Sequence, residues 1–431
     1  MNKYILAIDA GTTSSRAILF DKDANPVEIS QYEFNQFFPK EGWVEHDPME
    51  IWNTQLKAIK EVIQKSKIDP KNIDSIGITN QRETTVIWNK DNGQPVYNAI
   101  VWQDRRTASF CDKLKEDNKS ELIQNKTGLV IDAYFSGTKI KWILDSNIKI
   151  REQADNGQLI FGTIDTWLIW NLSKGKYHIT DPSNASRTLL YNIKDDKWDE
   201  ELLEIFDVPR NILPKVVDSS AISAYLDDEI IGTKIPIAGI AGDQQAALFG
   251  QLCVNPGDIK NTYGTGCFCV MNTGKSSVKS KNRMLSTIAW RINGELTYAL
   301  EGSVFVAGAL VQWLRDKLGI IKDALEVENL ANTVEDNGGI TFIPALSGLA
   351  APYWDPYVQG TIFGITRGTE NGHIARAALE SIALRTRDII IEMQKDAEIK
   401  FTNLKVDGGA SNNNLLMQIQ SDLLQTNVVR P

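Results

Sequence analysis

The chain has 431 residues, which is more than one ordinary hydrophobic core holds and suits two domains. Its 42% hydrophobic and 23% charged residues are typical of a globular protein in water. The net charge of −9 disfavours non-specific binding to nucleic acid or to anionic membranes. No apolar run approaches the roughly eighteen residues of a membrane-spanning helix, and residues 4–8 are too short for a signal peptide. We therefore expect a cytoplasmic protein without an integral membrane segment.

The cysteine content argues against a disulfide framework. The chain has four cysteines, Cys111, Cys253, Cys267 and Cys269, with no paired spacing. Cys267 and Cys269 alternate along an expected strand and so face the same side. A structural metal site would need more ligands, and the chain has only three histidines. This pattern favours the reducing cytoplasm.

The first twenty residues predict a hairpin with a polar turn. Two apolar runs, 5–8 and 17–20, read as its strands, and Gly11 allows a tight turn. The turn offers backbone N–H groups, four hydroxyls and one cation, from Thr12, Thr13, Ser14, Ser15 and Arg16. Asp9 stands beside it, where a magnesium-bound phosphate would need a carboxylate. The alternative is a plain hairpin, since turns favour the same residues.

A second stretch repeats this pattern. Residues 259–271 again read as strand, turn and strand, with Gly264-Thr265 in the place of Gly11-Thr12. One phosphate hairpin near the start of each half suggests a duplicated fold that holds a nucleotide between its halves.

The rest of the chain mixes strands with helices, which favours α/β domains of the actin-like type. Asp47-Pro48 is a helix start, with Asp47 as N-cap. Residues 171–230 should be irregular, with short pieces. We expect an N-terminal domain at 1–250 and a C-terminal domain at 251–431. Helices are expected near 48–63, 108–117, 119–126, 137–145, 165–170, 243–250, 303–318, 372–396 and 412–425. Strands are expected near 27–34, 73–78, 85–88, 100–102, 161–164, 235–240, 286–291, 296–301, 339–344, 360–366 and 404–406.

Two polar motifs follow expected strands, where α/β sheets usually bind ligands. Arg82 and Glu83, in the run 80–83, could hydrogen-bond neighbouring hydroxyls of a polyol, or could form a surface salt bridge. Asp243, at a strand-to-helix turn, could take the proton from a substrate hydroxyl, or could be a helix N-cap. The aromatic residues beside polar turns would suit the carbon edge of a polyol or simply fill the core: Trp102, Tyr134 and Phe268.

Two glycine-containing stretches are candidates for loops that bind a ligand through the backbone. The glycines of 407–411 can bring backbone close to a flat ring or a phosphate, although a simple turn explains them equally well. Residues 272–276 imitate the end of a P-loop, but Cys269 occupies the position of its first glycine, so we reject that motif.

Together and in this order, the motifs resemble the FGGY family of carbohydrate kinases, within the actin, Hsp70 and hexokinase superfamily, and its glycerol-phosphorylating branch in particular. The resemblance runs from Tyr4 to Pro431. It rests on residues 11–16, 42–48, 79–84, 134–139, 241–245, 263–266 and 406–410.

The resemblance implies two actin-like (ribonuclease H-like) α/β domains with a nucleotide cleft between them. The implied activity is ATP-dependent phosphorylation of glycerol to sn-glycerol 3-phosphate, with Asp243 as general base and Mg²⁺ oriented by Asp9. Glycerol would be bound by Arg82, Glu83, Tyr134, Asp243 and Gln244, with Trp102 and Phe268 against its carbons. The phosphates would face Thr12, Thr13, Ser14, Arg16 and Thr265, and the rest of the nucleotide would face Gly308, Gln312, Gly409 and Asn413. The sequence does not indicate the oligomeric state, and a homodimer and a homotetramer both stay open.

Three departures from the family pattern matter. Ala10 stands where many such kinases carry glutamine, and 226–236 lacks the glycine-rich loop and the histidine that serve regulation in some relatives. The chain stops at Pro431, where family members continue, so we expect an exposed apolar patch and lowered stability in the second domain. Two other functions stay open: a kinase of another small polyol or ketose, and an inactive truncated nucleotide-binding relative.

Overall fold

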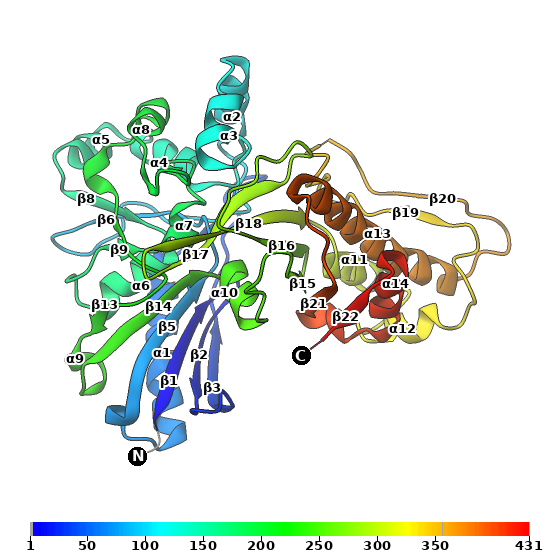
Figure 1. Cartoon of the computed structure of the whole chain (residues 1–431), viewed down its shortest axis with the longest axis horizontal. Coiled ribbons are helices and arrows are strands. Elements are labelled where there is room, and N and C mark those ends of the chain that lie inside the picture. The colour runs from blue at the N-terminus through cyan, green and yellow to red at the C-terminus, as the bar shows by residue number, and fades with distance from the viewer. Residues whose placement is uncertain (1–2, 356, 431) are drawn as a thin grey trace. The chain divides into compact units, whose positions relative to one another are not determined.

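The computed structural model describes residues 3–355 and 357–430 (Figure 1). The chain forms two compact units. The first comprises the residues up to Ala246 together with Thr287–Thr297, and the second comprises Ala247–Ser286 and the residues from Tyr298 onward. The hairpin of β17 (Leu285–Ile292) and β18 (Glu295–Val304) therefore contributes residues to both units.

The first unit is built on a mixed sheet in which β1 lies at the centre. β1 pairs antiparallel with β2 and parallel with β5, β2 pairs antiparallel with β3, and β14 adds parallel to β5 and antiparallel to β13. The strands are β1 (Tyr4–Ala10), β2 (Ser14–Phe20), β3 (Pro26–Glu33), β5 (Ile73–Asn80), β13 (Ser220–Leu226) and β14 (Ile235–Gly242).

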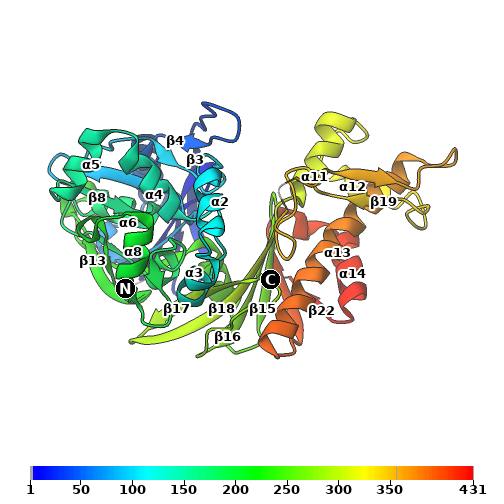
Figure 2. The ribbon, with the colours of Figure 1, turned by 90° about the horizontal axis from the view of Figure 1, so that it is seen from above.

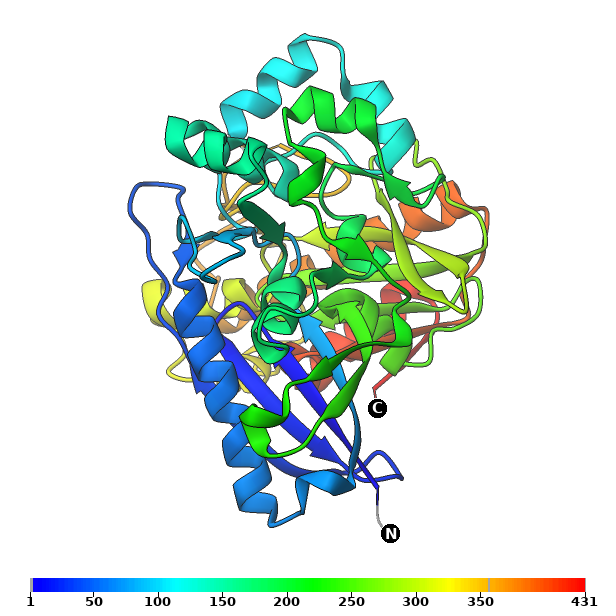
Figure 3. The same ribbon diagram turned by 90° about the vertical axis from the view of Figure 1, so that its left-hand side faces the viewer.

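One face of this sheet packs on helix α1 (Pro48–Ser66), which lies across the blue strands in Figure 3. Leu6, Ile8 and Leu19 alternate along their strands and are fully buried in that core. Asp47 accepts the backbone N–H of Met49 at 2.8 Å, which confirms the helix start expected from Asp47-Pro48.

The remaining elements of the first unit are short. Residues 171–230, expected to be irregular with short pieces, hold several brief helices and strands. Residues 226–236 end β13 and form the one-turn helix α9, in place of a glycine-rich loop. The helical segments are η1 (Pro70–Asn72), α2 (Ala108–Glu116), α3 (Ser120–Thr127), α4 (Ser136–Asp145), α5 (Ile148–Asp155), α6 (Ile164–Leu172), α7 (Pro182–Ala185), α8 (Glu200–Phe206), η2 (Arg210–Ile212) and α9 (Asp228–Ile231). Helix α10 (Asp243–Gly250) begins in the first unit and ends in the second. The strands are β4 (Glu45–His46), β6 (Val86–Asn89), β7 (Ala99–Ile100), β8 (Leu159–Gly162), β9 (Ile179–Thr180), β10 (Tyr191–Asn192), β11 (Lys197–Trp198) and β12 (Lys215–Val216).

The second unit repeats the topology of the first. β15 pairs antiparallel with β16 and parallel with β21, as β1 does with β2 and β5. β18 continues the sheet beyond β16, and β22 adds parallel to β21, as β14 adds to β5. The duplicated hairpin predicted from the sequence is therefore confirmed. These strands are β15 (Ile259–Tyr263), β16 (Cys267–Gly274), β21 (Asn403–Asp407) and β22 (Asn427–Val429).

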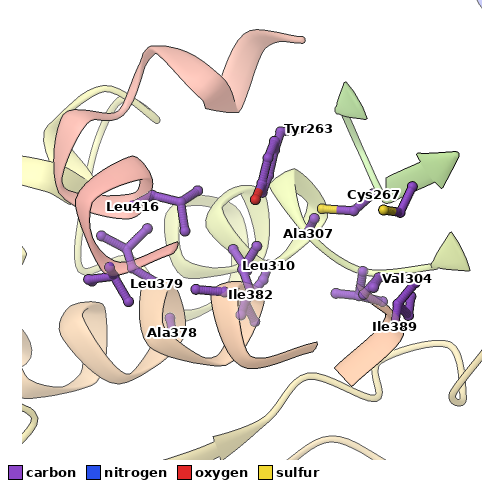
Figure 4. Packing of buried hydrophobic residues seen from close by; sticks show 14 of the residues in the cluster. Tyr263, Cys267, Val304, Ala307, Leu310, Ala378, Leu379, Ile382, Ile389 and Leu416 are labelled. Carbon is purple, nitrogen blue, oxygen red and sulfur yellow. The ribbon is translucent and has the colours of Figure 1, made fainter. Parts of the chain in front are cut away.

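Helix α13 (Asn371–Ala397) supplies much of the core of the second unit and packs along α14 (Asn414–Leu424) (Figure 2). Figure 4 shows Leu379 and Ile382 of α13 pointing into the same core as Leu310 and Leu416. Both helices lie where the sequence predicted them, because long apolar periodicities with capping residues fix their positions.

One expected helix, 303–318, differs in the structure. Strand β18 runs on to Val304, α11 (Gly308–Trp313) follows, and the segment continues as a π-helical turn, η3 (Leu314–Leu318). The apolar residues on either side of Val304 fit a buried strand as well as a helix, so periodicity alone misplaced the start. The other elements of this unit are α12 (Glu326–Ala331), β19 (Thr341–Ile343) and β20 (Thr361–Phe363).

The four cysteines are unpaired and buried. Within residues 3–355 and 357–430, none of the helices could serve as a membrane span. In the same ranges, no three side chains of His, Cys, Asp or Glu gather as a preformed metal centre.

Candidate active site

Arg82 lies at the centre of the candidate site in the first unit. Its Nε lies 3.1 Å from Asp243 Oδ1, its Nη1 donates to Gln245 Oε1 at 3.2 Å, and its Nη2 lies 3.5 Å from the hydroxyl of Tyr134. Its side chain is only 2% exposed. Three predicted site residues, Arg82, Tyr134 and Asp243, are therefore brought together at the ends of β5, β14 and the loop before α4.

Glu83 is buried beside Arg82 rather than exposed in a surface salt bridge. Its Oε1 accepts the Nε–H of Arg187 at 2.7 Å and lies 3.9 Å from Arg82 Nε. Its backbone φ of +61° is unusual for a residue with a side chain. Strained backbone of this kind concentrates at functional sites, where the surroundings hold it in place.

Asp243 begins helix α10, directly after β14 ends at Gly242. Its Oδ1 accepts the backbone N–H of Gln244 at 2.8 Å, one residue on, whereas an N-cap bonds two or three residues on. The side chain is 41% exposed, so one carboxylate faces both a buried guanidinium and solvent. This arrangement can fix the carboxylate and leave it accessible to a substrate hydroxyl.

Asp9 and Arg16 face each other across the first hairpin, where the register pairs them. Arg16 Nη1 lies 3.8 Å from Asp9 Oδ2, and the turn closes through the Gly11 N–H, which donates to Ser14 O at 2.9 Å. Burial raises the pKa of Asp9, the charge of Arg16 opposes this, and the charge of Asp243 adds to it. Asp9 and Asp243 thus repel each other, and a bound cation would relieve that repulsion.

Trp102 and Tyr134 form an aromatic wall beside Arg82. Their rings meet edge to face with centroids 5.6 Å apart. The Trp102 Nε1–H also donates to Thr12 Oγ1 at 3.0 Å, so the wall touches the turn of the first hairpin.

Sequence reasoning missed the buried turn around α7, which supports several strand ends. Ser183 Oγ accepts the Gly242 N–H at 2.9 Å, and Asn184 Oδ1 accepts the side-chain N–H of Asn80 at 3.0 Å. Arg187, just after this turn, holds Glu83. The signal was present: Asp181-Pro182 is an N-cap pair like Asp47-Pro48, and Asp181 does cap α7.

A second missed residue is Lys139 in α4. Its fully buried Nζ donates to the carbonyls of Tyr134, at 2.8 Å, and of Ala133. Burial lowers the pKa of Lys139 to about 8. A buried lysine that binds consecutive carbonyls fixes the loop that presents Tyr134, although nothing in the spacing of the sequence pointed to this role.

The predicted nucleotide residues Thr265 and Gly308 come together in the second unit. Gly308 N–H donates to Gly264 O at 3.0 Å, and the Ala309 N–H donates to Thr265 O at 3.0 Å. A Cβ at Gly308 would lie 2.6 Å from Gly264 O, so only glycine allows this approach. The second hairpin turn is thus held directly against the start of α11.

The other predicted residues of this unit are placed as follows. Gly409 opens the 3₁₀ turn η4 (Gly409–Asn412), after Gly408 has passed close to Tyr263 with φ of +87°. Asn413 caps α14 by accepting the Leu416 N–H at 2.8 Å, and Gln312 is exposed on α11. Phe268 lies on β16, opposite Ser303 of β18.

Comparison with known proteins defines the class. The N-terminal domain model of the FGGY family of carbohydrate kinases matches residues 4–250, and its C-terminal domain model matches 259–431. A crystal structure of Plasmodium falciparum glycerol kinase with ADP superimposes with a TM-score of 0.93 at 38% identity, covering 100% of this chain and 86% of that one. A gluconate kinase from Lactobacillus acidophilus reaches 0.89 at 23% identity, covering 100% and 86%, which shows the fold alone.

The fold is that of two-domain sugar kinases built on the actin-like ATPase architecture. The chain belongs to the FGGY family of carbohydrate kinases. Among curated relatives, glycerol kinase 2 of Thermotoga maritima is 59% identical over 429 residues, covering 100% of this chain and 86% of the relative. Glycerol kinase of a Thermoanaerobacter species is 60% identical over 431 residues, covering 100% and 87%.

Proposed function

We propose that this protein transfers the terminal phosphoryl group of ATP to glycerol and forms sn-glycerol 3-phosphate. The observation that carries the proposal is the carboxylate of Asp243, held by the buried guanidinium of Arg82 beside Glu83. The names and high identity of the curated relatives support the same substrate.

In the proposed reaction Asp243 accepts the proton of a glycerol hydroxyl while that oxygen attacks the terminal phosphorus of ATP. A new P–O bond forms, and the bond to the leaving ADP breaks. Arg82 and Glu83 hold neighbouring hydroxyls, as a donor and an acceptor respectively. We assign the remaining glycerol contacts to Trp102, Tyr134, Gln244 and Phe268.

We assign the phosphates and the nucleotide to residues of both hairpins and of the segments packed on the second one: Thr12, Thr13, Ser14, Arg16, Thr265, Gly308, Gln312, Gly409 and Asn413. Asp9 is the proposed Mg²⁺ residue, because it lies beside the phosphate turn and a bound cation would relieve the repulsion between its carboxylate and that of Asp243. When bound, Mg²⁺ neutralises charge on the transferred phosphate. A cytoplasmic location and a homodimer or homotetramer stay predictions.

The test is a coupled ADP-release assay with glycerol, xylulose, ribulose and gluconate, with the product identified by ³¹P NMR. We expect glycerol to give the highest kcat/KM, because the curated relatives that are 59% and 60% identical to this chain are glycerol kinases. The aromatic wall of Trp102 and Tyr134 beside Arg82 offers an apolar surface to the carbons of glycerol. A higher value for a ketose would instead favour the kinase of a larger polyol. If none of these substrates leads to ADP release, the result would favour an inactive nucleotide-binding relative.

A further inference from the structure

Gln81, the neighbour of Arg82, is only 2% exposed, and its backbone N–H and both polar groups of its side chain form hydrogen bonds. Its backbone N–H donates to Ala10 O at 2.8 Å. Its side-chain Nε2 donates to Gly11 O at 3.1 Å, and its Oε1 accepts the hydroxyl of Thr84 at 3.0 Å. One side chain therefore joins the turn of the first hairpin to the loop after β5.

The connection continues from Thr84 back to the hairpin turn. Thr84 Oγ1 accepts the backbone N–H of Trp102 at 3.3 Å while donating to Gln81. The indole N–H of Trp102 then donates to Thr12 Oγ1 at 3.0 Å. Since Thr12 follows Gly11, the bonds close a ring, which we call the Gln81 ring: Gly11, Gln81, Thr84, Trp102 and Thr12.

We propose that the Gln81 ring couples glycerol binding to nucleotide binding within the first unit, with Gln81 as its positioning residue. This inference rests on the proposed function, which places Trp102 against glycerol and Thr12 against phosphate. Because the indole N–H occupies a lone pair of Thr12 Oγ1, the hydroxyl hydrogen of Thr12 must point elsewhere. A phosphate oxygen that accepts this hydrogen makes Thr12 a better acceptor for Trp102.

The coupling has to be reciprocal. A nucleotide that orders Thr12 also orders Trp102, so glycerol then meets a wall that is already fixed. The nucleotide therefore raises the affinity for glycerol by some factor. By thermodynamic linkage, glycerol must raise the affinity for the nucleotide by the same factor, typically about 5–150-fold. A purely structural role of Gln81 would lower stability without changing this factor.

The first measurement is the dissociation constant of ADP with and without saturating glycerol, by calorimetry. Gln81→Met and Trp102→Phe each break the ring. Gln55→Met is the matched control, since buried Gln55 also donates to a carbonyl of the first hairpin, Arg16 O at 2.9 Å, but lies outside the ring. We expect the ratio of the two constants to fall close to one in both ring variants and to persist in the control. The proposal is overturned by a ratio that stays unchanged in the ring variants, that falls equally in Gln55→Met, or that equals one in an unmodified protein that does bind glycerol.

The second measurement needs no glycerol. In protein labelled with ¹⁵N-tryptophan, the indole resonance of Trp102 is assigned from its loss in Trp102→Phe. We expect ADP alone to shift it, and Gln81→Met to reduce that shift. If Gln81→Met does not fold, Thr84→Val breaks the ring one link further on. A Trp102 resonance that does not shift when ADP binds overturns the proposed coupling. Failure of the unmodified protein to bind glycerol refutes only the proposed substrate.

Discussion

Gly242 lies so close to the aliphatic part of Arg82 that no side chain fits between them. A Cβ at position 242 would lie 2.7 Å from Arg82 Cδ and 2.8 Å from Arg82 Cγ. The glycine before Asp243 is therefore required by packing and not by turn conformation. It allows the end of the strand before Asp243 to lie directly against the aliphatic part of Arg82, whose guanidinium holds the Asp243 carboxylate.

We expect Gly242→Ala to displace Arg82 and to lower kcat/KM for glycerol by about 100-fold, since misplacement by about 1 Å can cost that much. The measurement is steady-state kinetics, with the melting temperature as a check on folding. Gly232→Ala is the control, because a Cβ there meets nothing within 4 Å, although its φ of +83° costs some stability. Equal losses of kcat/KM in the two variants would argue against the packing explanation.

Asp243→Asn retains an oxygen for Arg82 and for the Gln244 N–H but cannot take up the substrate proton. We expect kcat to fall roughly 10²–10⁴-fold, with ADP affinity and melting temperature nearly unchanged. Asp47→Asn, which keeps the cap of α1, should leave kcat alone. Near-normal turnover in Asp243→Asn would remove the general base from the mechanism, and unfolding would favour a structural role.

Arg187→Met leaves the buried carboxylate of Glu83 without its 2.7 Å partner. Breaking a buried ion pair in this way costs about 3–5 kcal/mol, so urea denaturation should show a loss of that size. Adding Glu83→Gln removes the stranded charge and should restore part of the stability, but not glycerol binding. Full recovery of KM for glycerol in the double variant would show that Glu83 does not bind the substrate.

The sequence predicted the parts of the site that carry local signals. The hairpins, the start of α1 at Asp47 and the polar strand ends at Arg82 and Asp243 all have residue patterns with a physical reason. The support of Glu83 by Arg187 could not be foreseen, because 104 residues separate them and only the fold brings them together. The same holds for Trp102 and Thr12, which are 90 residues apart. Long-range contacts depend on how sheets and loops pack, and a single sequence does not display that packing.

Stability should also depend on pH through the fully buried His46. Burial lowers its pKa from 6.5 to about 4 in the folded protein. Between these pH values His46 is protonated in the unfolded chain but neutral in the folded protein. The free energy of unfolding therefore falls as the pH drops from about 6.5 to about 4. The shift corresponds to about 3 kcal/mol at 1.36 kcal/mol per unit.

Buried Asp165 acts in the opposite direction, so the pH profile of the whole protein cannot isolate His46. Burial raises the pKa of Asp165 to about 7, so the folded state binds a proton that the unfolded state has lost, and stability falls as the pH rises towards 7. The informative quantity is the difference in unfolding free energy between the unmodified protein and His46→Phe. We expect the His46→Phe variant to gain stability relative to the unmodified protein as the pH falls from 6.5 to 4, because phenylalanine cannot be protonated. A difference that stays constant over that range would mean that His46 titrates normally in the folded state.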